Sequence, residues 1–118
     1  MAALLVFLVA GAVERVAAQD EQPTVVVLTF KGAVTPVLNQ YLDTAIDAAL
    51  AAGSEAIILQ LDTPGGSVEV TKAITQDMLA SPVPIIVYVA PTGAQAASAG
   101  TFVTLAGHAA AMAPGASI

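Results

Sequence analysis

A serine surrounded by very small residues is the first feature of this sequence that could do chemistry. Ser98 lies in the segment 96–100 (AASAG), after an expected strand and loop and at the start of an expected helix. A nucleophile needs open approach, and a helix start favours the negative charge that develops on an attacked carbonyl oxygen. A serine in this place can also act as a helix N-cap or permit close packing. Ser98 alone therefore leaves both interpretations open.

A pair of glycines precedes the neighbouring helix. Gly65 and Gly66 follow the segment 62–64 (DTP), between an expected strand and an expected helix. Glycines let the backbone turn sharply, and they expose consecutive N–H groups with no side chain in the way. The helix start behind them adds partial positive charge. Ordinary turns use the same pair, but together these features could form an oxyanion hole.

Four other polar side chains could take part in catalysis, and we expect none of them to do so. Lys31 ends the first strand at the correct edge of the sheet, where we expect a solvated loop lysine, and Lys72 lies mid-helix at the surface. His108 follows the last helix and is separated from Ser98 by ten residues, about 15 Å of helix. Asp62 precedes a proline turn, where aspartate commonly accepts hydrogen bonds from nearby backbone N–H groups.

Alternating strands and helices must position these loops. Runs of β-branched and apolar residues predict strands, and apolar stripes of helical period, closed by proline or glycine, predict helices. The expected strands are 24–30, 56–61, 85–89 and 109–113, and the expected helices are 35–53, 67–80 and 96–106. Short connections in this order predict a parallel sheet with right-handed crossovers. The loops 62–66 and 90–98 then meet at the carboxyl edge, where such sheets carry their chemistry.

The composition excludes several classes of function. The chain has 118 residues, enough for one small domain, and it is 57% hydrophobic but only 10% charged, against about 25% charged in average proteins. A net charge of −6 with three Lys and Arg residues argues against a nucleic-acid partner. The chain has no cysteine and one histidine, so disulfides, thiolate sites and His-rich metal sites are excluded within it. We expect neither a metal nor another cofactor.

The N-terminal segment has the pattern of a targeting sequence. An uncharged apolar run over 2–13 is followed by small residues at 16–18, which predicts a signal peptide over 1–18 or a truncated membrane anchor. The run is shorter than the roughly 20 residues that span a membrane. Residues 19–23 form a polar linker, and 24–118 form the domain. A membrane span over 94–112 is disfavoured by its polar side chains and its dependence on alanine.

Three motifs in order carry a resemblance. The segments 62–67 (DTPGGS), 96–101 (AASAGT) and 112–118 (MAPGASI) resemble those of the NfeD family of membrane-bound serine proteases. This family is related to the Clp protease proteolytic subunit and to signal peptide peptidase A. The resemblance covers 24–118, and it implies an α/β fold of the ClpP/crotonase-like class. Such a fold has a mostly parallel sheet with flanking helices and would be incomplete in this sequence.

The resemblance also implies a mechanism and a setting. By position, Ser98 matches the nucleophile of a Ser–Lys dyad, and the Gly65–Gly66 loop, together with the backbone around Ala99, matches the oxyanion donors. The lysine base of the family lies some tens of residues after the serine, so residues 24–118 would be a partial, inactive serine peptidase domain. The implied substrates are apolar peptide segments, such as the C-terminal tail of a stomatin-like membrane protein. We expect a homo-oligomer in the cell envelope, exported or membrane-associated.

Two other functions remain open at this point. A crotonase-type acyl-CoA enzyme uses two backbone N–H groups in the same way, but it typically places carboxylates near the thioester, and no Asp or Glu follows Asp77 in this sequence. The chain could instead be a truncated, non-catalytic module that oligomerises or binds a membrane partner.

Overall fold

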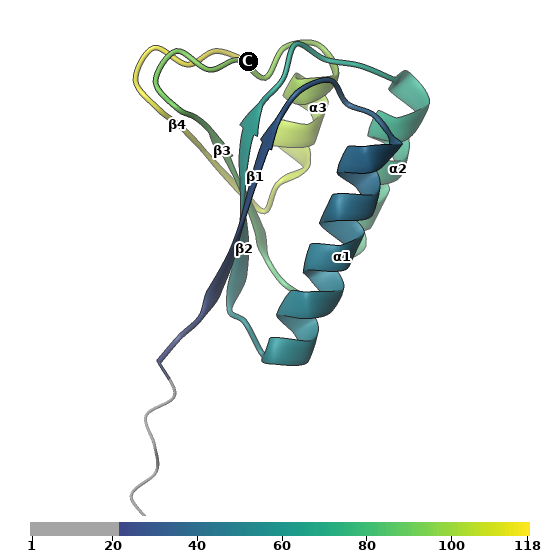
Figure 1. Ribbon diagram of the computed structural model, residues 1–118, viewed down its shortest axis with the longest axis vertical. Helices are drawn as coiled ribbons and strands as arrows, with labels where there is room; N and C mark the ends of the chain where they lie inside the picture. The colour runs from purple at the N-terminus through teal and green to yellow at the C-terminus, as the bar shows by residue number, and fades with distance from the viewer. Residues whose placement is uncertain (1–21) are drawn as a thin grey trace, which may run out of the picture.

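The computed structural model describes residues 22–118. The expected signal peptide or anchor over 1–18, and most of the expected linker over 19–23, lie outside the described residues. Strands and helices alternate along the chain in the predicted order (Figure 1). They are β1 (Val25–Lys31), α1 (Pro36–Ala52), β2 (Ala56–Asp62), α2 (Val68–Ala80), β3 (Ile85–Val89), α3 (Ala99–Ala106) and β4 (Ala109–Met112).

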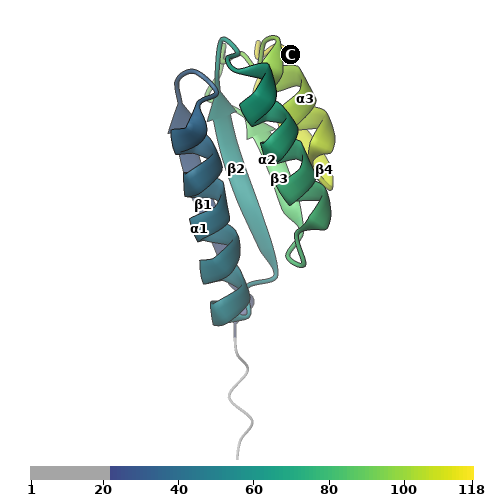
Figure 2. The same ribbon diagram turned by 90° about the vertical axis from the view of Figure 1, so that its right-hand side faces the viewer.

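The described strands form one parallel sheet in the order β1-β2-β3-β4. Each strand is added beside the previous one, so right-handed crossovers place every helix on the same face. Figures 1 and 2 show α1, α2 and α3 together on one side of the sheet. The predicted parallel α/β architecture is confirmed, and α1, α2 and α3 each start from the carboxyl edge of the strands.

A single apolar layer between the sheet and the helices holds the fold together. Alternate residues of β2 point into this layer, and Ile57, Leu59 and Leu61 are fully buried in it. Helix α1 contributes its buried stripe of Leu38, Leu42, Ala45 and Ala49, and α2 contributes Ile74 and Met78. Burial of each large apolar side chain stabilises the fold by about 1.5–3 kcal/mol. The other face of the sheet has no helix over it in residues 22–118.

The ends of α1 follow the predicted signals. Pro36 occupies the first helical turn, where its missing N–H costs nothing. Gly53 closes the helix in the left-handed conformation, with φ 64°, and its N–H group points at the carbonyl oxygens of Ala49 and Leu50. The strand Ala56–Asp62 can therefore follow within a few residues.

Helix α3 is shorter than predicted. The sequence predicts a helix over 96–106, but α3 begins at Ala99, so the prediction is wrong for its first three residues. The reason is that the preceding backbone bonds to other loops. The N–H of Ala96 donates to the Ser117 carbonyl (2.8 Å), and the N–H of Ala97 donates to the Thr63 carbonyl (3.0 Å). Strand β4 also ends one residue earlier than predicted, at Met112.

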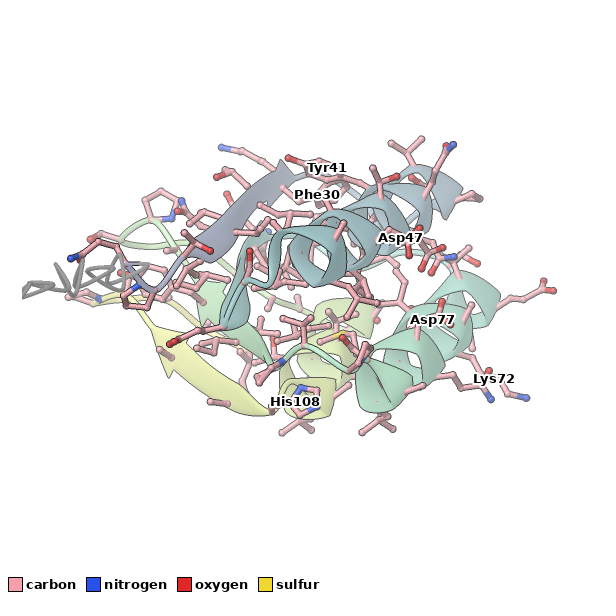
Figure 3. All side chains as sticks on the ribbon, turned by 90° about the horizontal axis from the view of Figure 1, so that it is seen from below. Phe30, Tyr41, Asp47, Lys72, Asp77 and His108 are labelled. Atoms are coloured by element: carbon pink, nitrogen blue, oxygen red, sulfur yellow. The ribbon has the colours of Figure 1, made fainter. Side chains whose placement is uncertain are left out.

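Three aspartates lie where α1 and α2 pack together. Asp43 and Asp47 lie one turn apart on α1, and Asp77 lies on α2; Figure 3 labels the last two. The pKa of Asp43 is raised above its ordinary value of 3.8, first by partial burial and then by repulsion from Asp77 and Asp47. The folded state therefore binds a proton more readily than the unfolded chain does. The stability associated with Asp43 is greatest below pH 3.8 and falls as the pH rises through the raised value.

The substitution Asp77→Asn is expected to stabilise the protein at pH 7. It removes one repulsive charge from Asp43, and because these groups are well solvated the gain should be about 0.3 kcal/mol. The gain should diminish as the pH falls toward the ordinary Asp pKa of 3.8, because Asp43, whose pKa is raised, then takes up a proton. Urea unfolding at several pH values measures it. The control Glu69→Gln should be destabilising at pH 7, because Glu69 lies in the first turn of α2, where an acid is favourable. A gain that does not depend on pH would contradict the repulsion argument.

Candidate active site

Three loops meet at the carboxyl edge of the sheet. Beyond the ends of the strands, parallel bridges join Val34 to Gly66, Thr63 to Ala96, and Gln95 to Ser117. These bridges extend the pairing of the sheet into the loops, so the segments 63–66, 95–98 and 113–118 lie side by side at the end of the sheet marked by the C-terminus in Figure 1. The loops 62–66 and 90–98, which the sequence placed at the same edge, are in contact.

Gly65 lies directly against Ser98. A Cβ atom at Gly65 would lie 2.9 Å from the Ser98 Cβ, 3.4 Å from its Oγ and 3.1 Å from the Ala97 carbonyl oxygen. The backbone of Gly65 also has φ +112°, which L-residues rarely adopt. Only glycine satisfies both conditions, so the loop approaches the serine as closely as a backbone can.

Ser98 has an unusual backbone conformation. Its φ is 54° and its ψ is −114°, and within residues 22–118 it is the only non-glycine residue with a positive φ. Such a conformation is costly and persists only where the surrounding structure imposes it. Ser98 occupies the N-cap position of α3, but its hydroxyl makes no capping hydrogen bond. The side chain is exposed, so the hydroxyl is open to a substrate.

The backbone N–H groups around Ser98 differ in availability. The Gly65 N–H donates to Thr63 Oγ1 (3.1 Å), so it is already occupied. The Gly66 and Ala99 N–H groups donate no hydrogen bond within residues 22–118. Ala99 is the first residue of α3, where the N–H has no partner inside the helix. Of the three residues expected to supply oxyanion donors, Gly66 and Ala99 therefore have free N–H groups. Gly65 instead lets the backbone of its loop approach Ser98 closely.

An apolar groove runs away from the serine between α2 and α3. Gly66 and Ser98 line one end of it, and its volume is about 490 Å³. Its lining includes four large and exposed apolar side chains, which a solvated helix pair would not normally present together: Val68, Leu79, Phe102 and Leu105. Both helices start beside Ser98, so the groove and the candidate nucleophile form one continuous surface.

The residues that the sequence offered as bases lie elsewhere. The Lys31 side chain is 83% exposed, and its Nζ lies 3.5 Å from Asp62 Oδ2. Asp62 Oδ1 accepts the N–H of Gln95 (3.1 Å), so its partner lies in the other loop and not in its own turn, where the sequence led us to expect it. His108 Nδ1 accepts the N–H of Ile85 (3.1 Å), at the start of β3 and therefore at the far edge of the sheet.

Lys72 lines the groove from an exposed position on the outer side of α2, where Figure 3 labels it. Within residues 22–118, no side chain forms a hydrogen bond with the Ser98 hydroxyl. The arrangement therefore presents an accessible hydroxyl, two free amides and an apolar groove, with no base in contact.

Two features are absent from the described part of the chain. Residues 22–118 contain no group of three or more His, Cys, Asp or Glu side chains placed to hold a metal ion. None of the helices described combines the length and the hydropathy that a membrane crossing requires.

Comparison with known proteins identifies relatives of this chain. The family model described as NfeD1b, N-terminal domain, matches residues 24–118. A membrane-bound protease of Pyrococcus horikoshii is 46% identical over 94 residues, which cover 80% of this chain and 21% of that protein. The chain thus spans about a fifth of the length of this curated relative.

Solved structures of the 1510-N membrane-bound stomatin-specific protease are also similar. A serine-to-alanine mutant has a TM-score of 0.79 and 42% identity, over 80% of this chain and 46% of that one. A lysine-to-alanine mutant in complex with a substrate peptide has a TM-score of 0.79 and 43% identity, over 81% of this chain and 44% of that one. This similarity confirms the predicted ClpP-like class of the fold.

Proposed function

This chain belongs to the NfeD1b N-terminal domain family, and we propose on that basis that it forms part of a serine peptidase whose nucleophile is Ser98. One observation carries the proposal. The exposed Ser98, held at positive φ, lies against Gly65, and it shares the groove with Gly66 and Ala99, whose N–H groups donate no hydrogen bond within residues 22–118. A named relative is a membrane-bound protease, and one of the similar structures is its serine-to-alanine mutant.

The proposed reaction is acyl transfer to the serine. Ser98 Oγ attacks the carbonyl carbon of a peptide bond, and a base takes the hydroxyl proton. The carbonyl oxygen becomes an oxyanion that accepts hydrogen bonds from the N–H groups of Gly66 and Ala99. When the tetrahedral intermediate collapses, the C–N bond breaks and the leaving amine takes the proton from the base. Water, deprotonated in turn by the base, then hydrolyses the acyl-enzyme and frees Ser98.

The base in this proposal is a lysine outside residues 22–118. A lysine can accept the proton only when burial lowers its pKa enough to keep it neutral. Lys31 is solvated and paired with Asp62, and Lys72 is exposed on α2, so neither side chain is buried. A lysine-to-alanine mutant among the similar structures supports a lysine in this role. Residues 24–118 would then be one part of a ClpP-like catalytic domain.

The proposed substrates are apolar peptide segments. The groove beside Ser98 is lined by exposed apolar side chains, including Phe102 and Leu105, which would contact such a segment next to the scissile bond. The 1510-N relative is specific for a stomatin homologue, so the tail of a stomatin-like membrane protein is the substrate that we propose. The corresponding setting is the cell envelope, with the protein exported or membrane-associated.

A non-catalytic role is the second candidate. On the face of the sheet away from the helices, Val25 and Val27 are exposed, and Ile58 and Ile86 are half-buried. An apolar face of this kind suits packing against other protein, either a second copy in a homo-oligomer or a membrane partner. In this case the chain would bind without cleaving.

A fluorophosphonate probe distinguishes the two functions. It should be applied to this 118-residue chain and to a longer polypeptide of the same gene that includes the lysine. We expect labelling of Ser98, mapped by mass spectrometry, in the longer form only, because the hydroxyl needs the base. Ser67, which caps α2 with its own side chain, is the internal control and should remain unlabelled. If neither form is labelled, the peptidase proposal is rejected in favour of the non-catalytic binding module.

A further inference from the structure

Thr63 connects the two loops of the site through its backbone. It follows β2 directly and is completely buried. Its N–H donates to the Gln95 carbonyl (2.6 Å), and its carbonyl accepts the N–H of Ala97 (3.0 Å). One residue therefore holds the segment that leads into Ser98 against the end of β2.

The side chain of Thr63 contacts both loops as well. Its hydroxyl donates to the Gly65 carbonyl oxygen (3.3 Å) and accepts the Gly65 N–H (3.1 Å). Its methyl group lies against the first turn of α3, where a Cβ atom on Gly100 would come within 2.6 Å of Thr63 Cγ2. The two branches of a single β-carbon thus set the distance between the glycine loop and the helix that begins after Ser98.

The hydrogen bonds to Gly65 also fix the direction of the next amide. The Gly65 carbonyl and the Gly66 N–H belong to one planar trans peptide, so they point in opposite directions. The Gly65 oxygen is held by the Thr63 hydroxyl and by the N–H of Val34 (2.8 Å). With this oxygen fixed from two sides, the Gly66 N–H cannot rotate without breaking both bonds.

From these contacts we propose that Thr63 is a positioning residue, which aims the Gly66 N–H at the substrate carbonyl that Ser98 attacks. The inference rests on the proposed peptidase function. Thr63 touches no substrate and acts through Gly65 and the peptide that follows it. An oxyanion donor is effective only when it is already oriented at the moment of reaction, so loss of this restraint should slow the chemical step more than it weakens binding.

The test compares Thr63→Val with Thr63→Ser in the full-length protein. Valine keeps the shape of threonine but removes both hydrogen bonds to Gly65, and we expect kcat for an apolar peptide to fall about 100-fold while KM changes little. Serine restores the hydroxyl, so it should recover most of kcat. The matched control is Thr104→Val, because Thr104 is also buried and its hydroxyl bonds a carbonyl, that of Gly100 (2.8 Å). Thr104→Val should retain the wild-type kcat.

The outcomes separate the two proposals. If the wild type hydrolyses peptides and Thr63→Val retains its kcat, the positioning role is overturned and the peptidase stands. If Thr63→Val and Thr104→Val reduce kcat equally, and the reduction follows the drop in melting temperature of each variant, the role of Thr63 is merely structural and the inference is again overturned. If the wild type neither hydrolyses peptides nor reacts with the probe, the proposed function fails and the inference fails with it.

Discussion

Replacing Ser98 by glycine is expected to abolish peptide hydrolysis and, at the same time, to make the protein more stable. Loss of a catalytic nucleophile reduces kcat by about 10⁵-fold to 10⁶-fold. The gain in stability has a separate cause, which is the positive φ of 54° at this position. Strain of this kind amounts to about 1–3 kcal/mol, and glycine relieves it.

The size of the stability gain follows from two opposing terms. Glycine loses more backbone entropy on folding than serine does, by about 0.5–1 kcal/mol. The net gain should therefore be about 1 kcal/mol, or about 4–8 °C in melting temperature for a domain of this size. Ser98→Ala should be equally inactive but should show no gain, because alanine retains the Cβ atom and the strain.

Both variants are measured in the same way. Hydrolysis of an apolar peptide is followed in the longer polypeptide, and thermal unfolding is followed by circular dichroism in this chain. The control Ser81→Ala changes a serine at the end of α2 whose hydroxyl bonds the Val83 carbonyl, and it should leave hydrolysis intact. Substantial hydrolysis by Ser98→Gly would remove Ser98 from the mechanism. Equal stabilities of the glycine and alanine variants would show that the strain is absent in solution.

Gly66→Ala is expected to have the largest effect on folding. A Cβ atom on Gly66 would lie 2.6 Å from the Val34 nitrogen and closer still to its carbonyl oxygen. These are backbone atoms of the segment between β1 and α1, which is itself fixed by hydrogen bonds from Val34 to Gly65 and from Ser67 to Val34. Since neither backbone can move away cheaply, we expect a loss of about 3 kcal/mol. Hydrolysis should also disappear, because the two segments must separate.

A second glycine provides the matched control for this variant. A Cβ atom on Gly53 would meet nothing within 4 Å, although φ is +64° there. Gly53→Ala should therefore cost only the backbone term of about 1 kcal/mol and leave hydrolysis unchanged. Urea unfolding of the two variants gives the comparison. If Gly66→Ala is no less stable than Gly53→Ala, the close approach of Val34 does not exist in solution.

The elements of the fold could be predicted from the sequence because their signals are local. Pro36 and Gly53 define the two ends of α1, and the period of apolar residues between them defines its buried face. The strands are short apolar runs bounded by turns, and their predicted limits differ from the observed ones by one residue or less. The order of the strands in the sheet has no such local signal, since it depends on which elements pack together.

The first turn of α3 shows where local signals fail. The residues 96–98 (AAS) have good or neutral helical propensity, so a sequence argument extends the helix through them. In the fold Ala96 bonds to Ser117 and Ala97 bonds to Thr63, and these long-range hydrogen bonds override the propensity. Only the run of very small neighbours indicated that the backbone there was tightly packed.

The different roles of Gly65 and Gly66 could not be predicted from the sequence either. Both glycines were expected to offer N–H groups, but the hydroxyl of Thr63 occupies the one on Gly65. A threonine two residues before a glycine forms this turn frequently, which is the signal that could have indicated it. That Thr63 also contacts α3 through Gly100 depends on the tertiary fold and could not be read from spacing.

Helices α2 and α3 both begin beside Ser98, and the donors proposed for the oxyanion are backbone N–H groups at or just before these two helix starts. Peptide groups do not titrate, so the attraction for a developing anion stays constant across every pH at which the chain is folded. A plot of kcat against pH should accordingly show a single ionisation, that of the group that deprotonates the serine. The midpoint of this curve would report the environment of that group, because the proposed oxyanion donors do not change their own charge with pH.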